Sequence, residues 1–275
     1  MLIDAHQHFW RVGENGFSWP TPDLAAIHRD FGPADLAAVA APLDLAGSVL
    51  VQSQPDDRDT DWLLAMAGEE PLVRGVVGWV DLASPDALAR IARLSENPKL
   101  RGLRPMLQSL DDDAWIAAPG LDPALDAMIA HGLSLDALVL TRHLPHLLAL
   151  ARRRPELAIV IDHGAKPPIA VGDKDGAWAR GIDALAAQPQ VFCKLSGLLT
   201  EAAPGQGAQA LSPYVAHLVA SFGPERLMWG SDWPVLNLAG DYGGWLALAR
   251  NLSGLTDAAD LAALFGGTSR RFYRI

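Results

Sequence analysis

The sequence has little of three features that mark secreted, membrane and nucleic-acid-binding proteins. It contains a single cysteine, Cys193, so no disulfide can form within the chain, and a reducing cytoplasm is the expected setting. No apolar run approaches the roughly 18 residues that a membrane-spanning helix requires, and no basic stretch followed by an apolar segment suggests a signal peptide. Basic residues are also few, because 22 lysines and arginines face 32 aspartates and glutamates, which gives a net charge of -10. Such a chain repels phosphate backbones and anionic lipids, so we expect neither nucleic acid nor a membrane as a partner.

What the chain does have is apolar sequence, which makes up 50% of its 275 residues and is enough to bury a full core. Short apolar runs alternate with Ala- and Leu-rich stretches of helical character. Continuous apolar runs are typical of strands covered by helices. The runs are Leu2–Phe9, Ser48–Gln54, Gly75–Asp81, Leu100–Leu107, Leu133–Val139, Ala158–His163, Val191–Ser196 and Leu227–Trp233.

Eight strand–helix units in a chain of this length predict an α/β fold of the (β/α)8 TIM-barrel type, formed by residues 1–275 as a single domain. A doubly wound open sheet is the structural alternative. It usually has fewer strands, and no G-x-G-x-x-G motif follows the first strand here. The segment Arg11–Phe31 is longer than an ordinary loop, so we expect it to cap the mouth of the barrel.

Polar residues at the ends of the predicted strands are the candidates for chemistry, because active sites of TIM barrels lie at the C-terminal ends of the strands. His6 and His8 are two apart on the first strand and therefore point to one face. His163 ends the sixth strand and Asp232 lies near the end of the eighth, so all four side chains should converge. Imidazole nitrogens and a carboxylate are ligands for a divalent metal such as zinc. A metal there would lower the pKa of a bound water toward about 7, and a free carboxylate could accept its proton.

Five short segments carry more specific information when they are taken together. They are DAHQHFW at Asp4–Trp10, LRGLR at Leu100–Arg104, IDHGAKP at Ile161–Pro167, KLSG at Lys194–Gly197 and WGSDWP at Trp229–Pro234. In this order they resemble the amidohydrolase superfamily, and within it the amidohydrolase-related (amidohydrolase 2) branch of sugar-lactone hydrolases. The resemblance runs from the first strand to the last helix. It implies a metal-dependent type of hydrolase barrel that opens a lactone ring in carbohydrate metabolism.

The resemblance also implies roles for individual residues. By position, the metal ligands would be His6, His8, His163 and Asp232. Asp232 would hold the attacking water, and His163 or Arg104 would stabilise the oxyanion. The other side chains expected to contact the substrate are polar or aromatic residues at strand ends: Arg104, Lys194, Gln52, Trp10, Trp79 and Trp233.

Two departures from the superfamily pattern concern the metal. Many members have a bridging carboxylated lysine on the fourth strand and a histidine on the fifth, where this chain has Arg104 and Asp136. A binuclear site is therefore not expected. Two options stay open: one divalent metal, with zinc as the first choice, or none, since some lactonases of this branch work without one. The role of Asp136 also stays open, because a buried ion pair explains it as well as a site residue does.

We expect a small-molecule substrate, an aldonolactone such as L-fuconolactone, which is opened to the hydroxy acid. Arg101 and Arg104 are three apart on a strand, so only one arginine faces the interior, and this favours a neutral sugar. The alternatives are a metal-dependent decarboxylase of the same fold, a hydrolase of a dicarboxylate pyrone-type lactone, and a barrel that binds without chemistry. The sequence leaves the particular lactone and the oligomeric state open.

Overall fold

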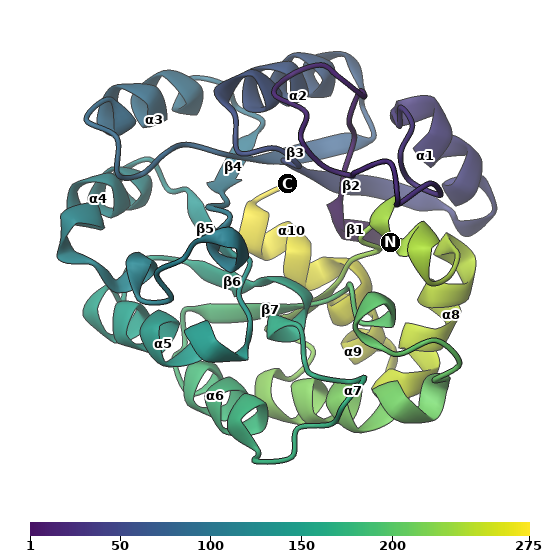
Figure 1. The fold of residues 1–275 in the computed structure, drawn as a ribbon. Helices are drawn as coiled ribbons and strands as arrows, with labels where there is room; N and C mark the ends of the chain where they lie inside the picture. Colours follow the sequence, from purple (N-terminus) through teal and green to yellow (C-terminus); the bar gives the residue numbers. More distant parts are fainter.

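The eight predicted strands form one parallel sheet that curls into a barrel. The computed structural model describes all residues, 1–275. Each strand pairs with the next in sequence order, β1 to β8 (Figure 1). Backbone hydrogen bonds link the two edge segments, from His8 N to Trp233 O (2.8 Å) and from Asp232 N to His6 O (2.8 Å). The predicted TIM barrel is confirmed. The strands are β1 Leu2–Gln7, β2 Leu45–Val51, β3 Val73–Gly78, β4 Leu100–Leu103, β5 Ser134–Ala137, β6 Ile159–Ile161, β7 Val191–Leu195 and β8 Leu227–Trp229.

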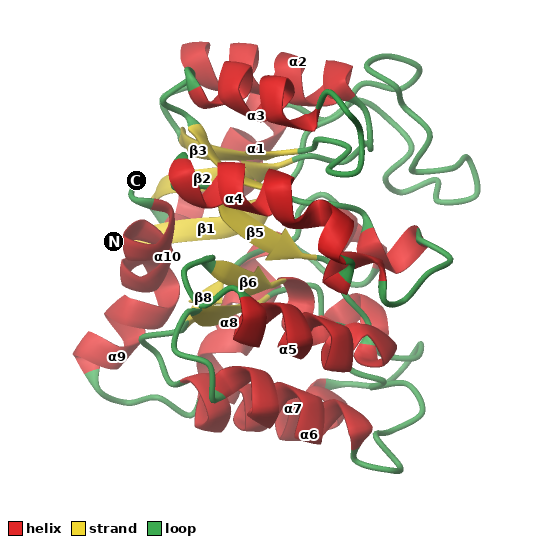
Figure 2. Cartoon of the chain, turned by 90° about the vertical axis from the view of Figure 1, so that its left-hand side faces the viewer, coloured by secondary structure: helices red, strands yellow, loops and turns green.

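Helices surround the strands, and the two ends of the barrel differ. Figure 2 shows both chain termini at one end and the long loops at the other, where the strands finish. None of the helices is both long and apolar enough to span a bilayer. The helices are α1 Pro33–Ala40, α2 Asp57–Glu69, α3 Ala87–Ser95, α4 Asp122–Ala130, α5 Leu144–Arg153, α6 Ala177–Ala186, α7 Ala208–Phe222, α8 Tyr242–Ser253, α9 Ala258–Ala262 and α10 Thr268–Tyr273.

The barrel interior is packed with branched side chains and closed by the last helix. A small buried cluster inside the barrel contains Val49, Val51, Val77 and Val160, as expected for the narrow interior of this fold. The same cluster contains Tyr273 of α10, whose hydroxyl donates to Asp136 of β5. Figure 1 shows α10 across the centre of the barrel. The C-terminal segment therefore plugs the end opposite to the long loops.

The start of α2 fixes the loop that follows β2. Asp56 caps the helix by accepting the backbone N–H of Arg58 (2.9 Å), and acidic residues in the first turn complement the positive end of the helix dipole. One of them, Asp59, accepts the backbone N–H groups of Ser53 (2.9 Å) and Gln54 (3.1 Å). The loop after β2 is thereby held against the barrel mouth.

Candidate active site

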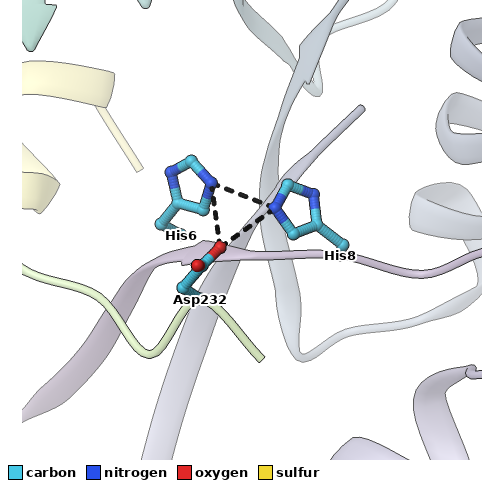
Figure 3. A group of neighbouring side chains, drawn as sticks. All are labelled: His6, His8 and Asp232. Carbon is cyan, nitrogen blue, oxygen red and sulfur yellow. Dashed lines mark hydrogen bonds and ion pairs between the residues drawn. The ribbon is translucent and has the colours of Figure 1, made fainter. Parts of the chain in front are cut away.

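Four side chains from three strand ends meet at the mouth of the barrel. We call them the His/Asp cluster: His6, His8, His163 and Asp232. The Nε2 atoms of His6 and His8 are 3.1 Å apart, and they lie 3.7 Å and 3.3 Å from Asp232 Oδ1 (Figure 3). His163 Nε2 lies 3.8 Å from the same oxygen. All four residues are buried, so the convergence expected from the sequence is present in the fold.

The backbone carries strain at the two residues that received catalytic assignments. His163 has φ 53° and Asp232 has φ 58°, which is the left-handed region that non-glycine residues rarely adopt. Such conformations cost on the order of 1–3 kcal/mol each and are concentrated at functional sites. In this backbone conformation both side chains point toward the centre of the barrel mouth, where they contact the other imidazoles.

Glycines beside the cluster give the imidazoles room. A Cβ atom on Gly197 would lie 2.5 Å from His163 Nδ1, and one on Gly230 would lie 2.8 Å from His6 Cβ. Both distances are far below van der Waals contact. This accounts for a glycine in each of the segments KLSG and WGSDWP.

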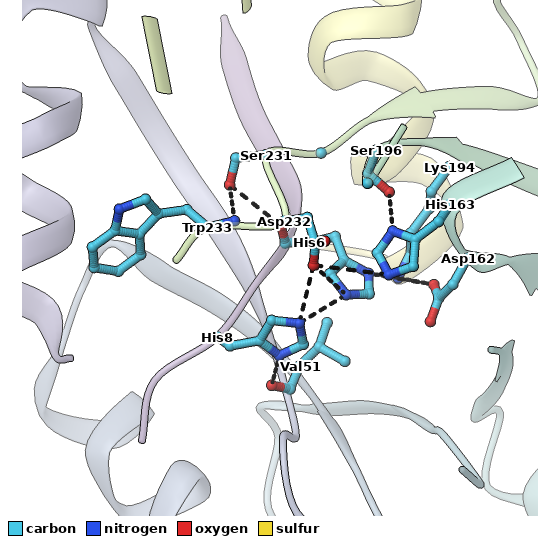
Figure 4. A network of polar contacts seen from close by, with 12 residues as sticks. His6, His8, Val51, Asp162, His163, Lys194, Ser196, Ser231, Asp232 and Trp233 are labelled. Carbon is cyan, nitrogen blue, oxygen red and sulfur yellow. Dashed lines mark hydrogen bonds and ion pairs between the residues drawn. The ribbon is translucent and has the colours of Figure 1, made fainter. Parts of the chain in front are cut away.

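Neighbouring groups orient two of the imidazoles, and for His8 the neighbour also fixes a proton. His8 Nδ1 lies 2.8 Å from the carbonyl oxygen of Val51 (Figure 4). A carbonyl only accepts, so Nδ1 carries the proton and Nε2 presents its lone pair to the cluster. His163 Nδ1 lies 2.9 Å from Ser196 Oγ, which again leaves Nε2 toward the cluster.

Burial keeps His6 and His163 neutral, whereas the surrounding imidazoles keep Asp232 ionised. Burial lowers the pKa of His163 to about 4 and holds the pKa of His6 well below its usual value, and the charge of Lys194 adds to the effect at His6. Burial alone would raise the pKa of Asp232. His163, His8 and His6 outweigh that effect and hold it below the usual range. At neutral pH the cluster therefore contains uncharged His6 and His163 imidazoles beside the Asp232 carboxylate.

Beneath His6 lies a fully buried ionic network. Lys194 Nζ is 2.6 Å from Asp136 Oδ2, 2.9 Å from Asp162 Oδ1 and 3.1 Å from His6 Nδ1. Arg104 lies 3.5 Å from the other oxygen of Asp162. Burial would lower the pKa of Lys194, but the two carboxylates raise it above its usual value. Asp136 thus belongs to a buried ion pair, which was one of its two interpretations.

The donor set fits a single divalent ion. Ligand atoms bound to zinc at about 2.0–2.1 Å in a tetrahedron lie about 3.3 Å from one another. The His6, His8 and Asp232 atoms are 3.1, 3.3 and 3.7 Å apart. His6 and His163 also form a potential ligand group with Asp162, a residue that the sequence analysis did not assign to the site.

A cavity of about 350 Å3 opens onto the cluster. This is near the lower end of the range of about 300–1,000 Å3 that is typical for small-molecule sites. Of the residues assigned from the sequence, His8, His163, Asp232 and Arg104 line it. Lining residues that sequence reasoning missed include Ser18, Trp19, Ser53, Met106, Gln108 and Lys166.

A family model described as Amidohydrolase matches residues 3–275. The chain belongs to the amidohydrolase family. An L-fucono-1,5-lactonase of Burkholderia ambifaria is 53% identical over 277 residues, which cover 99% of this chain and 95% of the relative. An L-fucono-1,5-lactonase of Burkholderia multivorans is 35% identical, with 100% and 96% covered. A crystal structure of an amidohydrolase from Burkholderia multivorans with bound zinc is 35% identical, with a TM-score of 0.93 over 100% and 99% of the two chains. The resemblance seen in the sequence is thus confirmed.

Three expected substrate contacts in this amidohydrolase need correction because the side chains are buried behind the cavity wall. Trp10 packs against Trp19 and donates its Nε1–H to Arg29 O (2.8 Å). The Trp233 indole packs in the aromatic core, and Figure 4 shows it directed away from the His/Asp cluster. Gln52 is fully buried and donates to the carbonyl oxygen of Arg104 (2.9 Å). These three residues support the cavity wall instead of touching a ligand.

Two further assignments are corrected by position. Trp79 lines a separate surface pocket together with residues of α2 and α3, such as Asp57 and Arg90, so it cannot stack on a ligand in the main cavity. Lys194 has no exposed side-chain surface, because the ion pairs with Asp136 and Asp162 hold it under His6. Lys194 therefore acts on the site through His6.

The missed aromatic residue, Trp19, is held over the cavity of the amidohydrolase by Gln54. The Gln54 amide donates to Trp19 O (2.7 Å), while its oxygen accepts from Ser18 N (2.9 Å) and Ser18 Oγ (3.3 Å). Gln54 is buried, and its own backbone is fixed by Asp59. The predicted loop Arg11–Phe31 thus does reach the mouth, and Gln54 latches it there.

Replacing Gln54 with leucine is expected to raise KM for the substrate by about tenfold, because each lost net hydrogen bond is worth about 1 kcal/mol and Trp19 is released. The value of kcat should change less, since the His/Asp cluster is untouched. Steady-state kinetics measure both. The matched control is Gln188→Leu, a glutamine just after α6 whose side chain bonds only to Ala184 O. Equal KM values for the Gln54 and Gln188 variants would contradict the role of Gln54 in holding Trp19 over the cavity.

Proposed function

We propose that this amidohydrolase hydrolyses the ring ester of a sugar lactone, and that L-fucono-1,5-lactone belongs to its substrates. The observation that carries this proposal is the cavity, which ends on Asp232, His8 and His163. It is otherwise lined by three serines, Gln108, one tryptophan, two cationic side chains and four apolar residues. Two relatives that match nearly the whole chain, at 53% and 35% identity, are L-fucono-1,5-lactonases.

In the proposed reaction Asp232 holds the attacking water. Its contacts with the imidazoles are all made through Oδ1, so Oδ2 remains for the water proton. Water adds to the ring carbonyl, and the negative charge that develops on the carbonyl oxygen needs a donor. Arg104 lines the cavity, and its guanidinium is oriented by Asp162 and by the carbonyl oxygen of Gln52. Cleavage of the ring C–O bond then yields the hydroxy acid.

We propose one divalent metal, zinc, held by His6 Nε2, His8 Nε2 and Asp232 Oδ1, with His163 Nε2 as the fourth ligand. When bound, the ion would lower the pKa of its water and polarise the carbonyl. The neutral state of His6 and His163 and the spacing of the donor atoms support this site. The zinc in a 35% identical structure supports it as well.

The charges around the cavity favour a neutral sugar over a dicarboxylate pyrone or a carboxylated aromatic. Arg104 and Lys166 are the cationic side chains of the lining. Each already has a carboxylate partner, with Asp162 at 3.5 Å and Glu201 at 3.7 Å. Asp232 adds a negative charge, so the side chains of the lining by themselves offer a dianionic substrate no net positive field.

A pH-indicator assay distinguishes these activities. Lactone hydrolysis releases acid, whereas decarboxylation of an aromatic acid consumes a proton. We expect acid release with aldonolactones, and proton uptake with a hydroxybenzoate would overturn the proposal in favour of the decarboxylase. After dialysis against a chelator, kcat/KM should fall by at least about 10²-fold and recover with zinc. Full activity in protein that elemental analysis shows to lack metal would contradict the proposed metal site but not the lactonase activity.

A further inference from the structure

The turn after β6 contains four consecutive residues in the left-handed conformation. They are His163 (φ 53°), Gly164 (φ 57°), Ala165 (φ 62°) and Lys166 (φ 47°). Only the glycine adopts this conformation without steric strain, and such residues normally occur singly. The turn places His163 and Lys166, its first and last members, in the lining of the same cavity.

We propose that Lys166 is a further catalytic residue, which donates a proton to the ring oxygen of the lactone as the C–O bond breaks. The inference rests on the proposed lactonase function and deepens it. The carbonyl carbon, after addition of water, expels the ring oxygen together with the electron pair of the C–O bond. That oxygen takes a proton from the Lys166 ammonium and becomes the hydroxyl of the product. The neutral amine regains a proton from solvent, and the proton of the attacking water leaves through Asp232.

The chemistry of the lining selects Lys166 for this step. A departing alkoxide is a much stronger base than an amine, so an ammonium group protonates it favourably. Arg104, the other cation, does not release its proton, because a guanidinium is too weak an acid to serve as a proton donor. Arg104 follows β4 and contacts Asp162, which begins the turn after β6, whereas Lys166 ends that turn. Both side chains line the cavity, so with the oxyanion at Arg104 the leaving oxygen can face Lys166.

Glu201 holds the ammonium ready without burying it. Its Oε1 lies 3.7 Å from Lys166 Nζ, and each side chain is 24% exposed, so the pair borders both the cavity and solvent. Glu201 follows β7 and belongs to a different loop from Lys166. Burial and the charge of Asp232 raise the pKa of Glu201, which is consistent with its position beside the site. A loose pair of this kind can open toward a substrate and can pass a proton from water to the amine.

Substitution of Lys166 by glycine separates a catalytic role from a purely structural one. At φ 47° a glycine is free of the strain that a lysine carries, so Lys166→Gly should retain or raise the melting temperature. If the strain serves catalysis, the same substitution should abolish most of the turnover. Stability and activity are therefore expected to move in opposite directions.

The test compares Lys166→Met, Lys166→Gly and Lys166→Cys with the wild type on L-fucono-1,5-lactone. The control is Lys174→Met, an exposed lysine on the same long loop. We expect kcat to fall by about 10²-fold or more in each Lys166 variant, with KM changing far less, and no change in the control. Alkylation of Lys166→Cys with 2-bromoethylamine rebuilds an ammonium at the same distance and should restore most of kcat. The labelling is selective because Cys193 is fully buried and burial raises the pKa of its thiol.

Three results would overturn the role of Lys166: unchanged kcat in Lys166→Met, a loss confined to KM, or no recovery after alkylation. A drop in melting temperature that parallels the loss of activity in all three variants would also contradict it. Wild-type protein without lactone turnover would instead contradict the proposed function itself, so the two failures are distinguishable.

Discussion

Asp232→Asn is expected to lower kcat for lactone hydrolysis by about 10²–10⁴-fold, the usual contribution of a general base. The amide has the same shape but cannot accept the water proton, and it removes the only carboxylate in contact with all three imidazoles. Melting temperature should change little, since the backbone of this turn is also held through its neighbour Ser231, whose N–H and hydroxyl donate to Asp4 at 2.8 Å and 2.6 Å. Steady-state kinetics on the folded variant provide the measurement.

The control for this prediction is Asp111→Asn, which removes an exposed carboxylate outside the cavity. Its kcat should equal that of the wild type. Near-normal turnover in Asp232→Asn would eliminate the role of Asp232 as base, and the His/Asp cluster would then need another explanation.

The largest expected effect on stability comes from Lys194→Met. The substitution leaves Asp136 and Asp162 buried together without their shared cation, and breaking a buried ion pair in this way typically costs about 3–5 kcal/mol. Methionine fills the space of the lysine stem, so a cavity does not account for the loss. Urea denaturation measures the change in the free energy of unfolding.

A second variant checks the cause of that loss. Combining Lys194→Met with Asp136→Leu removes one of the two stranded carboxylates, so the double variant should be more stable than Lys194→Met alone. A double variant that is less stable would show that packing, rather than uncompensated charge, determines the effect.

The barrel and the convergence of His6, His8, His163 and Asp232 were predictable because both follow from simple periodicities. Parallel strands covered by helices appear as apolar runs, and their C-terminal ends meet at one mouth. Polar residues at those ends therefore share a site, whatever the details of the loops. Gly197 and Gly230 were visible in the motifs. Only the structure shows why these positions need glycine, because His163 and His6 approach them closely.

The errors arose where the direction of a side chain depends on tertiary packing. Trp10 and Trp233 lie next to site residues in sequence, but the bridge between Trp10 and Phe31 and the surrounding aromatic core turn their rings away from the cavity. Trp79 follows β3 and lies in the surface pocket formed with α2 and α3, so the packing of these helices places its ring away from the cavity.

Asp162, Trp19 and Lys166 were missed because irregular backbone places them. In a regular strand, Asp162 and His163 would point to opposite sides. The left-handed conformation at His163 breaks this alternation, so both side chains contact His6. Trp19 arrives on a long loop that only the Gln54 latch positions. The spacing of apolar residues along the sequence predicts neither the left-handed turn at His163 nor the position of Trp19.

The central claim, that the His/Asp cluster opens a sugar lactone, is tested most directly by initial rates of acid release from L-fucono-1,5-lactone by zinc-loaded wild-type protein, with spontaneous hydrolysis subtracted. The account predicts saturable turnover with kcat/KM in the ordinary enzymatic range of about 10⁴–10⁸ M⁻¹s⁻¹, and a rate near background with Asp232→Asn. Rates at background for the wild type, across this lactone and a panel of its stereoisomers, would contradict it.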